Sequence, residues 1–241
     1  MTSIKTVGLI KKYGDVVAVD NLNLKINQGE LFALLGVNGA GKSTTIKMLS
    51  CLTIPTGGDA HVGGYSIQKE AKQVKSLIGV SPQETAIAPN LTSKENLEFM
   101  CGIYGLSKEK TGEKIKELSD QFDLEKILNR KASKLSGGWQ RRLSIAMALV
   151  GEPTILFLDE PTLGLDVIAR RELWDVIQTL KGRITIILTT HYMEEAEALS
   201  DRIGIMKDGA LLTVGTVDEL KKMTNNDDFE NAFVTIIREG I

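Results

Sequence analysis

One segment, Gly36-Val-Asn-Gly-Ala-Gly-Lys-Ser-Thr44, constrains this chain most, because it fits the pattern G-x-x-x-x-G-K-[ST] of a phosphate loop. Its glycines let the backbone fold around an anion, and a following helix presents its positive N-terminus to that anion. An apolar run of strand length, Leu31–Leu35, precedes the segment, and a helical pattern from Lys42 to Leu52 follows it. A strand, a glycine turn and a helix in this order begin an α/β unit. The alternative is a tight strand-to-helix turn that binds nothing.

Further apolar runs extend the α/β pattern along the chain. Strands are expected at Ile4–Ile10 and Leu22–Ile26, and again at Ile155–Leu158 and Ile184–Leu188. The last two are continuous runs, typical of parallel strands covered on both faces, and a helical pattern follows each. Lys207-Asp-Gly-Ala210 predicts a hairpin turn, because Asp and Gly tolerate positive φ there. These patterns predict a largely parallel sheet.

Residues from about 91 to 150 have a mostly helical pattern and interrupt the α/β core. Thr92-Ser-Lys-Glu95 is a capping box, so a helix is expected to begin at Ser93. Apolar residues from Leu143 to Val150 follow i, i+3, i+4, i+7 spacing, which gives the helix after Gly138 one apolar face.

Composition excludes several classes of protein. Hydrophobic residues make up 42% of the chain and charged residues 25%, which is typical of globular domains. With Lys+Arg 29 against Asp+Glu 31, the net charge is −2, so we expect no nucleic-acid partner. The chain contains no apolar run of membrane-spanning length, and its start lacks a secretory signal pattern. With Cys51 and Cys101 as the cysteines, we expect a reduced, cytoplasmic protein without a disulfide framework or a cysteine metal cluster.

A second chemical element follows the apolar run Ile155–Leu158, which ends in Asp159 and Glu160. A buried strand carries such residues to the carboxyl edge of the sheet, where open α/β sheets bind ligands. Beside a phosphate loop, Asp159 would hold Mg²⁺ through its water shell, and Glu160 would orient or deprotonate the water that attacks a γ-phosphate. Lys42 would reach the β- and γ-phosphates, and the Ser43 hydroxyl would bind Mg²⁺. The alternative is a pair of carboxylates that merely ends a strand.

The segment Leu135-Ser-Gly-Gly138-Trp-Gln-Arg-Arg142 is the most informative. A serine and two glycines that enter a helix form a second anion-binding N-terminus. Because one phosphate loop already surrounds a nucleotide from one side, this second site implies that another surface, such as that of another chain, completes the pocket. The alternative is a serine N-cap followed by glycines that allow tight helix packing.

Together these motifs resemble the nucleotide-binding subunit of ABC transporters. The same order includes Gln83 in Ser-Pro-Gln-Glu, Gly164-Leu-Asp166, and His191 at the end of Ile184–Thr190, and the match covers nearly the whole chain. The resemblance implies an α/β P-loop ATPase core with a mostly parallel sheet, an N-terminal antiparallel β subdomain and a helical insertion. It predicts a single domain over residues 1–241. Its parts are a core (about 1–90 and 151–223), a helical subdomain (about 91–150) and a C-terminal extension (about 224–241).

The resemblance implies a role for each motif residue. Gln83 looks like the loop glutamine that touches Mg²⁺ and the attacking water and senses the membrane partner, and His191 looks like the switch histidine at the γ-phosphate. Tyr13 is similar to the aromatic residue that stacks on adenine, although an isolated surface tyrosine is an alternative. The implied catalytic residues are Glu160, His191, Gln83 and Lys42. The implied metal ligands are Ser43, Gln83 and Asp159. The implied ATP-binding residues are Tyr13, Asn38, Gly39, Ala40, Gly41, Lys42, Ser43, Thr44, Ser136, Gly138 and Asp166.

The resemblance also implies partners. Two copies would form a head-to-tail homodimer around two ATP molecules, with Ser136 and Gly138 on the ATP of the opposite copy and Asp166 in a loop that crosses to it. Integral membrane permease subunits would hold the dimer at the inner face of the cell membrane. The segment Leu91–Leu97 resembles the branch that exports drugs, lipids, polysaccharides or sodium, and Pro161–Arg171 is similar to sodium- and drug-extrusion subunits.

Two departures from the family pattern concern single positions. Trp139 stands where Gln or a smaller residue is common, and Leu163 replaces a frequent Ser or Asn. In the tail, Phe229 and Phe233 are interpreted either as a small C-terminal core or as a partner site.

Two other functions are weighed against transport. A non-transport ABC ATPase that acts on nucleic acid or ribosomes usually carries coiled coils or two cassettes, and this chain shows no sustained heptads and no basic excess. A plain P-loop kinase or GTPase leaves residues 135–142 unexplained.

Overall fold

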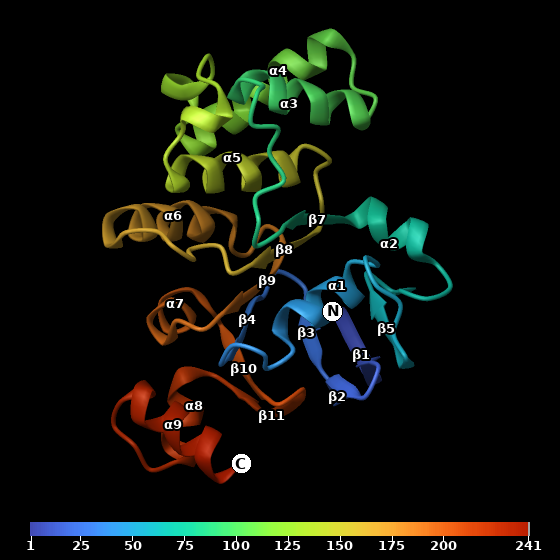
Figure 1. Cartoon of the computed structure of the whole chain (residues 1–241), viewed down its shortest axis with the longest axis vertical. Coiled ribbons are helices and arrows are strands. Elements are labelled where there is room, and N and C mark those ends of the chain that lie inside the picture. The colour runs from blue at the N-terminus through green and yellow to red at the C-terminus, as the bar shows by residue number, and fades with distance from the viewer. Residues whose placement is uncertain (241) are drawn as a thin grey trace.

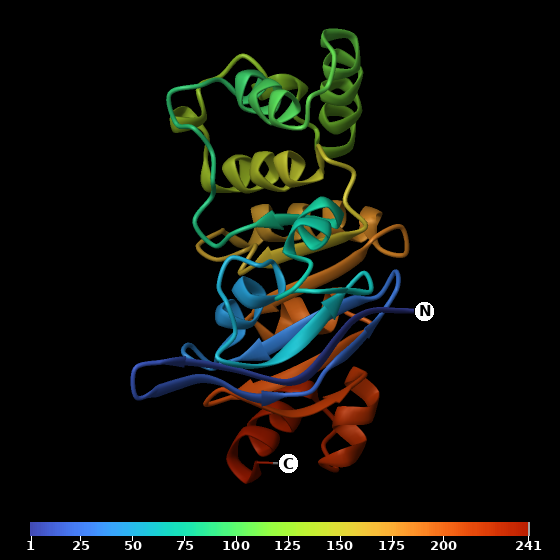
Figure 2. The same cartoon turned by 90° about the vertical axis from the view of Figure 1, so that its right-hand side faces the viewer.

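Two β-sheets form the framework of the protein, whose computed structural model describes residues 1–240 (Figures 1 and 2). The N-terminal sheet is antiparallel and has the order β2-β1-β5-β6, with β3 also paired to β1. Its strands are β1 (Thr2–Tyr13), β2 (Val16–Leu22), β3 (Lys25–Asn27), β5 (Gly57–Val62) and β6 (Tyr65–Ser66). The predicted antiparallel part of the fold is thereby confirmed.

The second sheet has the order β11-β10-β4-β9-β8-β7, and all its neighbouring strands are parallel except the β10–β11 pair. Its strands are β4 (Leu31–Gly36), β7 (Ile78–Ser81), β8 (Ile155–Asp159), β9 (Thr185–Thr190), β10 (Arg202–Lys207) and β11 (Ala210–Gly215). The predicted mostly parallel sheet is confirmed. The β10–β11 turn has Asp208 at φ 48° and Gly209 at φ 83°, as its sequence predicts.

Helices cover the second sheet and form both ends of the molecule, with α3 and α4 at one end and α8 and α9 at the other (Figure 1). The helices are α1 (Lys42–Leu49), α2 (Ala71–Leu77), α3 (Ser93–Ile103), α4 (Lys108–Phe122), α5 (Gly137–Leu149), α6 (Val167–Leu180), α7 (Met193–Leu199), α8 (Val217–Met223) and α9 (Phe229–Glu239), with short 3₁₀ turns at Glu125–Ile127 and Ala132–Lys134. The α3 capping box is present: the Glu95 N–H donates to Thr92 Oγ1 at 3.2 Å, and the Thr92 N–H donates to Glu95 Oε2 at 2.7 Å. Among residues 1–240, no helix combines the length and the apolar character needed to cross a bilayer.

Some predicted boundaries are wrong, for identifiable reasons. The single strand expected at Leu22–Ile26 is divided between β2 and β3. At the break, the Asn23 side chain accepts the Gly8 N–H through Oδ1 at 2.9 Å and donates to the Asn21 carbonyl at 2.8 Å. The helix expected to reach Leu52 ends at Leu49, because Cys51 takes a left-handed φ of 56°. The strand expected from Ile184 begins one residue later, and the first strand extends beyond Ile4–Ile10 at both ends.

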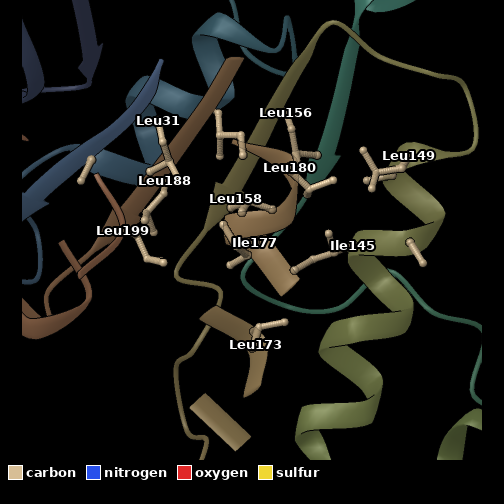
Figure 3. Packing of buried hydrophobic residues seen from close by; sticks show 14 of the residues in the cluster. Leu31, Ile145, Leu149, Leu156, Leu158, Leu173, Ile177, Leu180, Leu188 and Leu199 are labelled. Carbon is tan, nitrogen blue, oxygen red and sulfur yellow. The ribbon is translucent and has the colours of Figure 1, made fainter. Parts of the chain in front are cut away.

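Apolar side chains fill both sides of the parallel sheet. Successive residues of β4 point to opposite faces, so that Phe32 and Leu34 pack toward the antiparallel sheet and α1, while Leu31 and Leu35 pack toward the helices of the other face. Figure 3 shows the face toward which Leu31 and Leu35 point, where α5 and α6 pack against β8. The side chains that meet there are Ile145, Leu149, Leu156, Leu158, Leu173, Ile177 and Leu180. Because both faces are covered, the carboxyl ends of the strands are held rigidly.

The C-terminal segment packs onto this core. Phe229 and Phe233 are 2% and 9% exposed and join the same hydrophobic cluster as Leu220. Lys207 Nζ donates to the Ile237 carbonyl at 2.9 Å near the end of α9. The interpretation of the two phenylalanines as a small C-terminal core is therefore the one that the structure supports.

Candidate active site

Four neighbouring parallel strands place the predicted motifs at one edge of the sheet. In the order β4-β9-β8-β7, their carboxyl ends lead to the glycine loop, His191, Glu160 and Gln83, respectively. These segments enclose a pocket of about 390 Å³, which is lined by Ala18, Asn38, Gly39, Ala40, Gly41, Lys42, Ser43, Thr44, Gln83, Glu160, Leu163 and His191. Residues distant in sequence thus converge on one cavity, as expected where parallel strands end together.

The loop between β4 and α1 requires glycine for steric reasons. Gly41 has φ +98°, and a Cβ there would lie 2.3 Å from the Ala18 carbonyl oxygen. At Gly36, a Cβ would lie 2.4 Å from the Met206 carbonyl oxygen. The backbone therefore passes closer to its neighbours than any side chain would allow. The N-terminus of α1 begins directly after this loop and adds the partial positive charge that favours an anion.

Lys42 lies in the wall of the pocket and is only 5% exposed. Its Nζ donates to the carbonyls of Gly36 at 2.8 Å and Val37 at 3.2 Å, and it lies 3.4 Å from Glu160 Oε1. This ammonium is a compact cation at the mouth of the loop, where it can neutralise a phosphate.

Ser43 and Asp159 form the part of the site that suits a metal ion. The Ser43 hydroxyl donates to Asp159 Oδ1 at 2.8 Å, and the same carboxylate oxygen accepts from Thr189 Oγ1 at 2.6 Å. A hydroxyl and a carboxylate side by side provide the hard oxygen donors that Mg²⁺ takes, usually with phosphate oxygens and water completing the shell. The donor set therefore fits the predicted metal.

Glu160 is held in an unusual backbone conformation beside a histidine. It is 6% exposed and has φ 49°, and its N–H donates to both the carbonyl and the hydroxyl of Thr189, at 3.1 and 3.0 Å. Its Oε2 lies 2.6 Å from His191 Nδ1. A positive φ at a non-glycine residue costs free energy, and such residues cluster at functional sites. Two other segments thus hold Glu160: Lys42 of α1, and Thr189 with His191 at the end of β9.

Gln83 reaches the pocket from the irregular segment that follows β7. Its side chain is exposed, but its backbone is fixed: the Gln83 carbonyl accepts from Arg141 Nη2 at 2.7 Å, and the Pro82 carbonyl accepts from Arg141 Nη1 at 2.6 Å. The motif around Gln83 does not indicate this contact with Arg141.

Comparison with known proteins decides the family. The family model described as "ABC transporter" matches residues 19–163, a stretch that includes the phosphate loop, Gln83 and Glu160. The chain belongs to the ABC transporter ATP-binding family. Members of this family hydrolyse ATP, and the geometry of the pocket agrees with that activity.

Relatives of this ABC ATPase carry transport names. The chain is 42% identical over 245 residues to the probable multidrug ABC transporter ATP-binding protein YbhF of Escherichia coli, covering 99% of this chain and 42% of YbhF. It is 40% identical over 240 residues to the daunorubicin resistance ATP-binding protein DrrA3 of Streptomyces coeruleorubidus, covering 99% and 75%, respectively. It is 44% identical over 208 residues to the human phospholipid-transporting ATPase ABCA3, covering 86% and 12%. The chain thus spans less than half the length of YbhF and a small part of ABCA3.

Solved structures show the same fold. An ATP-binding subunit of an ABC transporter superposes with a TM-score of 0.86 at 28% identity, over 98% of this chain and 99% of that one. A dimeric ATP-binding cassette bound to ADP and Pi, in a post-hydrolysis state, gives a TM-score of 0.80 at 29% identity, over 88% and 98%. The predicted α/β P-loop ATPase fold is confirmed.

Four predicted ATP-binding residues of this ABC ATPase lie outside the pocket of their own chain. Tyr13 ends β1 and is 49% exposed, with Lys11 Nζ 4.8 Å from its ring centroid. Asp166 caps α6, accepting the N–H groups of Ile168 and Ala169, both at 2.9 Å. Their roles at ATP stay predictions.

The other two residues lie at the N-terminus of α5. Ser136 occupies the N-cap position, but its side chain makes no capping hydrogen bond and is exposed. A Cβ at Gly138 would lie 3.2 Å from Ala169 Cβ, so this glycine does allow α5 and α6 to pack closely. Tight packing thus accounts for a glycine at position 138, and the hydroxyl of Ser136 is available to a ligand. The roles of both residues at ATP stay predictions.

The structure shows the surroundings of Trp139 and Leu163, the two residues that depart from the family pattern. Two cations lie close to the partly buried Trp139 ring, with Lys126 Nζ at 5.0 Å and Arg142 Cζ at 4.8 Å from its centroid. Leu163 is 38% exposed and lines the pocket. Neither residue disturbs the loop glycines or the backbone of α5.

Several residues of the site carry no sequence signal. Ala18, in β2 of the antiparallel sheet, lines the pocket. The Thr189 hydroxyl links two site residues, because it donates to Asp159 Oδ1 and accepts the Glu160 N–H. Glu195, on α7, is fully buried, and its Oε1 accepts from Trp174 Nε1 at 3.1 Å. Burial raises the pKa of the Glu195 carboxyl, against the smaller opposing effects of Thr190, Thr162 and Trp174.

This raised pKa predicts a pH-dependent stability. Between the ordinary pKa of Glu and the raised folded value, the folded state binds more protons than the unfolded chain, so stability falls as pH rises through that window, by up to about 1.4 kcal/mol per pH unit. Glu195→Gln retains an acceptor for Trp174 but has no proton to lose. We expect the variant to gain stability over the wild type at pH 8 relative to pH 5 in urea unfolding. Glu197→Gln, with its side chain 48% exposed, is the control; equal pH slopes in all three proteins would refute the assignment.

Proposed function

We propose that this chain is the Mg-dependent ATPase subunit of an ABC exporter, in which ATP brings two copies together and hydrolysis separates them again. The observation that carries the proposal is the shared pocket: the phosphate loop with Lys42 forms one wall, and the Glu160–His191 pair forms another. A phosphate held by the first wall lies within reach of the base in the second.

The residues of this chain account for the chemistry by position and charge. Lys42 neutralises the phosphate that the loop binds, Glu160 accepts a proton from the attacking water, and His191 holds the Glu160 carboxylate in orientation and contacts the γ-phosphate. Gln83 orders the water from the opposite side. In-line attack of water on a bound phosphate needs positioning and charge neutralisation, and no covalent intermediate on the protein is required.

Ser43, Asp159 and Gln83 are the residues proposed to hold Mg²⁺. When bound, the ion neutralises negative charge on the phosphate oxygens. The 2.8 Å contact between Ser43 Oγ and Asp159 Oδ1 supports a shared metal position between these two side chains.

A head-to-tail dimer explains the residues outside the pocket. The exposed Ser136 hydroxyl and the exposed Asp166 lie on segments that a second copy can bring to the γ-phosphate. A structural relative of this chain is a dimeric cassette bound to ADP and Pi, which supports this arrangement. Because ATP binds the closed dimer better than separate protomers, nucleotide shifts the population toward the dimer.

Membrane permease subunits are the proposed further partner, and the inner membrane face is the proposed location. The names of YbhF and DrrA3, a probable multidrug ABC transporter ATP-binding protein and a daunorubicin resistance ATP-binding protein, support export of drug-like molecules. Exposed apolar side chains on α3, Phe99 at 59% and Ile103 at 62%, offer a surface for these subunits in the proposed helical subdomain (about 91–150). The net charge of −2 and the transport relatives do not favour the nucleic-acid alternative.

Phosphate release at increasing protein concentration tests the proposal. If the active species is a dimer, the rate at low concentration rises with the square of the protein concentration, and EDTA abolishes it. Parallel reactions with GTP, and with and without a phosphate acceptor, test the kinase and GTPase alternatives. A rate per protomer that stays constant on dilution, while light scattering shows monomers, would contradict the sandwich.

A further inference from the structure

One face of α5 packs along β7 and along the segment that comes after this strand. A Cβ at Gly79 would lie 2.3 Å from the Ala148 carbonyl oxygen, so the strand and the helix are in backbone contact. One turn earlier on the helix, the Ser144 hydroxyl lies 2.9 Å from the hydroxyl of Ser81, the last residue of β7. Arg141 lies one turn earlier again, on the same face.

Arg141 continues this line of contacts beyond the end of the strand. Its side chain is buried, with 5% exposed, and its two terminal nitrogens donate to two successive carbonyls, Pro82 at 2.6 Å and Gln83 at 2.7 Å. Charge-assisted bonds of this length are strong, and a planar fork fixes the orientation of both peptide groups. Burial lowers the pKa of the Arg141 guanidinium, and the nearby Asp159 carboxyl opposes part of that shift.

The two hydrogen bonds from Arg141 matter because few other contacts fix the backbone near Gln83. Between β7 and α3, residues 82–91 form no strand or helix. Their next side-chain anchor is Asn96, which exchanges hydrogen bonds with the backbone of Ala88 at 2.7 and 3.1 Å. The backbone orientation of Gln83, and with it the direction of its side chain into the pocket, therefore depends on Arg141.

We propose that Arg141 is a positioning residue, which holds Gln83 at the ATP site of its own chain. The helix that carries Arg141, α5, contributes to the ATP site of the partner. The inference rests on the proposed dimer, in which Ser136 and Gly138 of α5 contact the ATP of the opposite copy. A small displacement of α5 on engagement with that ATP moves the Arg141 guanidinium, and the two carbonyls move with it. One helix thus joins the two ATP sites directly.

Mixed dimers distinguish this role from general support of α5. One protomer carries Glu160→Gln, so that hydrolysis occurs only at the site of the other protomer. Arg141→Met is then placed either in the hydrolysing protomer or in the Glu160→Gln protomer, with different affinity tags to purify each combination. Single-turnover cleavage of radiolabelled Mg-ATP is measured in both arrangements and in the mixed dimer that carries only Glu160→Gln.

The two arrangements are expected to differ. With Arg141→Met in the hydrolysing protomer, the rate constant falls by about 10- to 100-fold, because Gln83 there is misplaced. With Arg141→Met in the other protomer, the rate constant stays within about twofold, because that protomer contributes only the N-terminus of α5. Equal losses in both arrangements, loss only in the second, or no loss in either would overturn the proposal.

Further variants control for folding. Arg142→Met removes a comparably buried guanidinium from the same helix, one that instead bonds Glu172 at 2.7 Å, and should leave the single-turnover rate near that of the reference dimer. Arg141→Lys restores the rate only in part, because one ammonium replaces the planar fork. ATP concentrations for half-saturation should stay similar in all variants. Absence of ATP-dependent dimers in the Glu160→Gln protein itself would instead count against the proposed function.

Discussion

In the Glu160→Gln protein, Mg-ATP is expected to bring two copies into a stable dimer while phosphate release falls by about 10²- to 10⁴-fold, the usual contribution of a positioned base. The side chain is 6% exposed and keeps its size in the amide, so the fold and the contact with His191 survive. An amide cannot accept the proton of the attacking water. It also removes a negative charge next to the γ-phosphate, which strengthens ATP binding in the closed dimer.

Light scattering with and without Mg-ATP, together with a phosphate-release assay, measures both effects. Glu194→Gln is the matched control, because this neighbouring carboxylate is 83% exposed and lies outside the pocket. The control should hydrolyse ATP at the wild-type rate and dissociate after turnover. A Glu160→Gln protein that remains monomeric at high concentrations of protein and Mg-ATP would refute the sandwich, whatever its hydrolysis rate.

Much of this site follows from sequence because of how parallel strands end. The phosphate loop, Asp159 with Glu160, and His191 each follow an apolar run, and runs of that kind become neighbouring strands whose carboxyl ends share one edge. The local chemistry of each motif then suffices to predict that the side chains meet. For that reason the pocket is lined by the phosphate loop, Glu160 and His191, and Asp159 lies beside it, bonded to Ser43.

Other features depend on contacts that a linear pattern does not encode. The end of α1 depends on Cys51 at φ 56°, a conformation for which this residue type has no preference. Arg141 finds its carbonyl partners 59 and 58 residues earlier in the chain, and nothing in its own segment indicates that contact. Tyr13 acts only when ATP is bound, and Ser136 and Asp166 act only when ATP and a second copy are present, so their roles stay predictions.

Replacing Lys42 by alanine is expected to have two separate effects. Lys42 and Glu160 are both buried, and their charged atoms lie 3.4 Å apart, so removing the ammonium leaves a buried carboxylate without its cation. Breaking such a pair destabilises a fold by up to about 3–5 kcal/mol, and His191 compensates part of this loss. Lys42→Ala also removes the cation that neutralises a bound phosphate, so ATP affinity and hydrolysis fall as well.

The double variant Lys42→Ala with Glu160→Gln separates these effects. Because the double variant has neither charge of the pair, its urea unfolding free energy should recover toward that of Glu160→Gln alone. A ligand that binds only the folded state stabilises that state. Mg-ATP should therefore raise the unfolding midpoint of the Glu160→Gln variant strongly, whereas the midpoint of the double variant should not increase. Recovery of both stability and the ATP response would mean that Lys42 serves only as the partner of Glu160. Recovery of stability alone would place the Lys42 ammonium on the phosphate, as the proposed function expects.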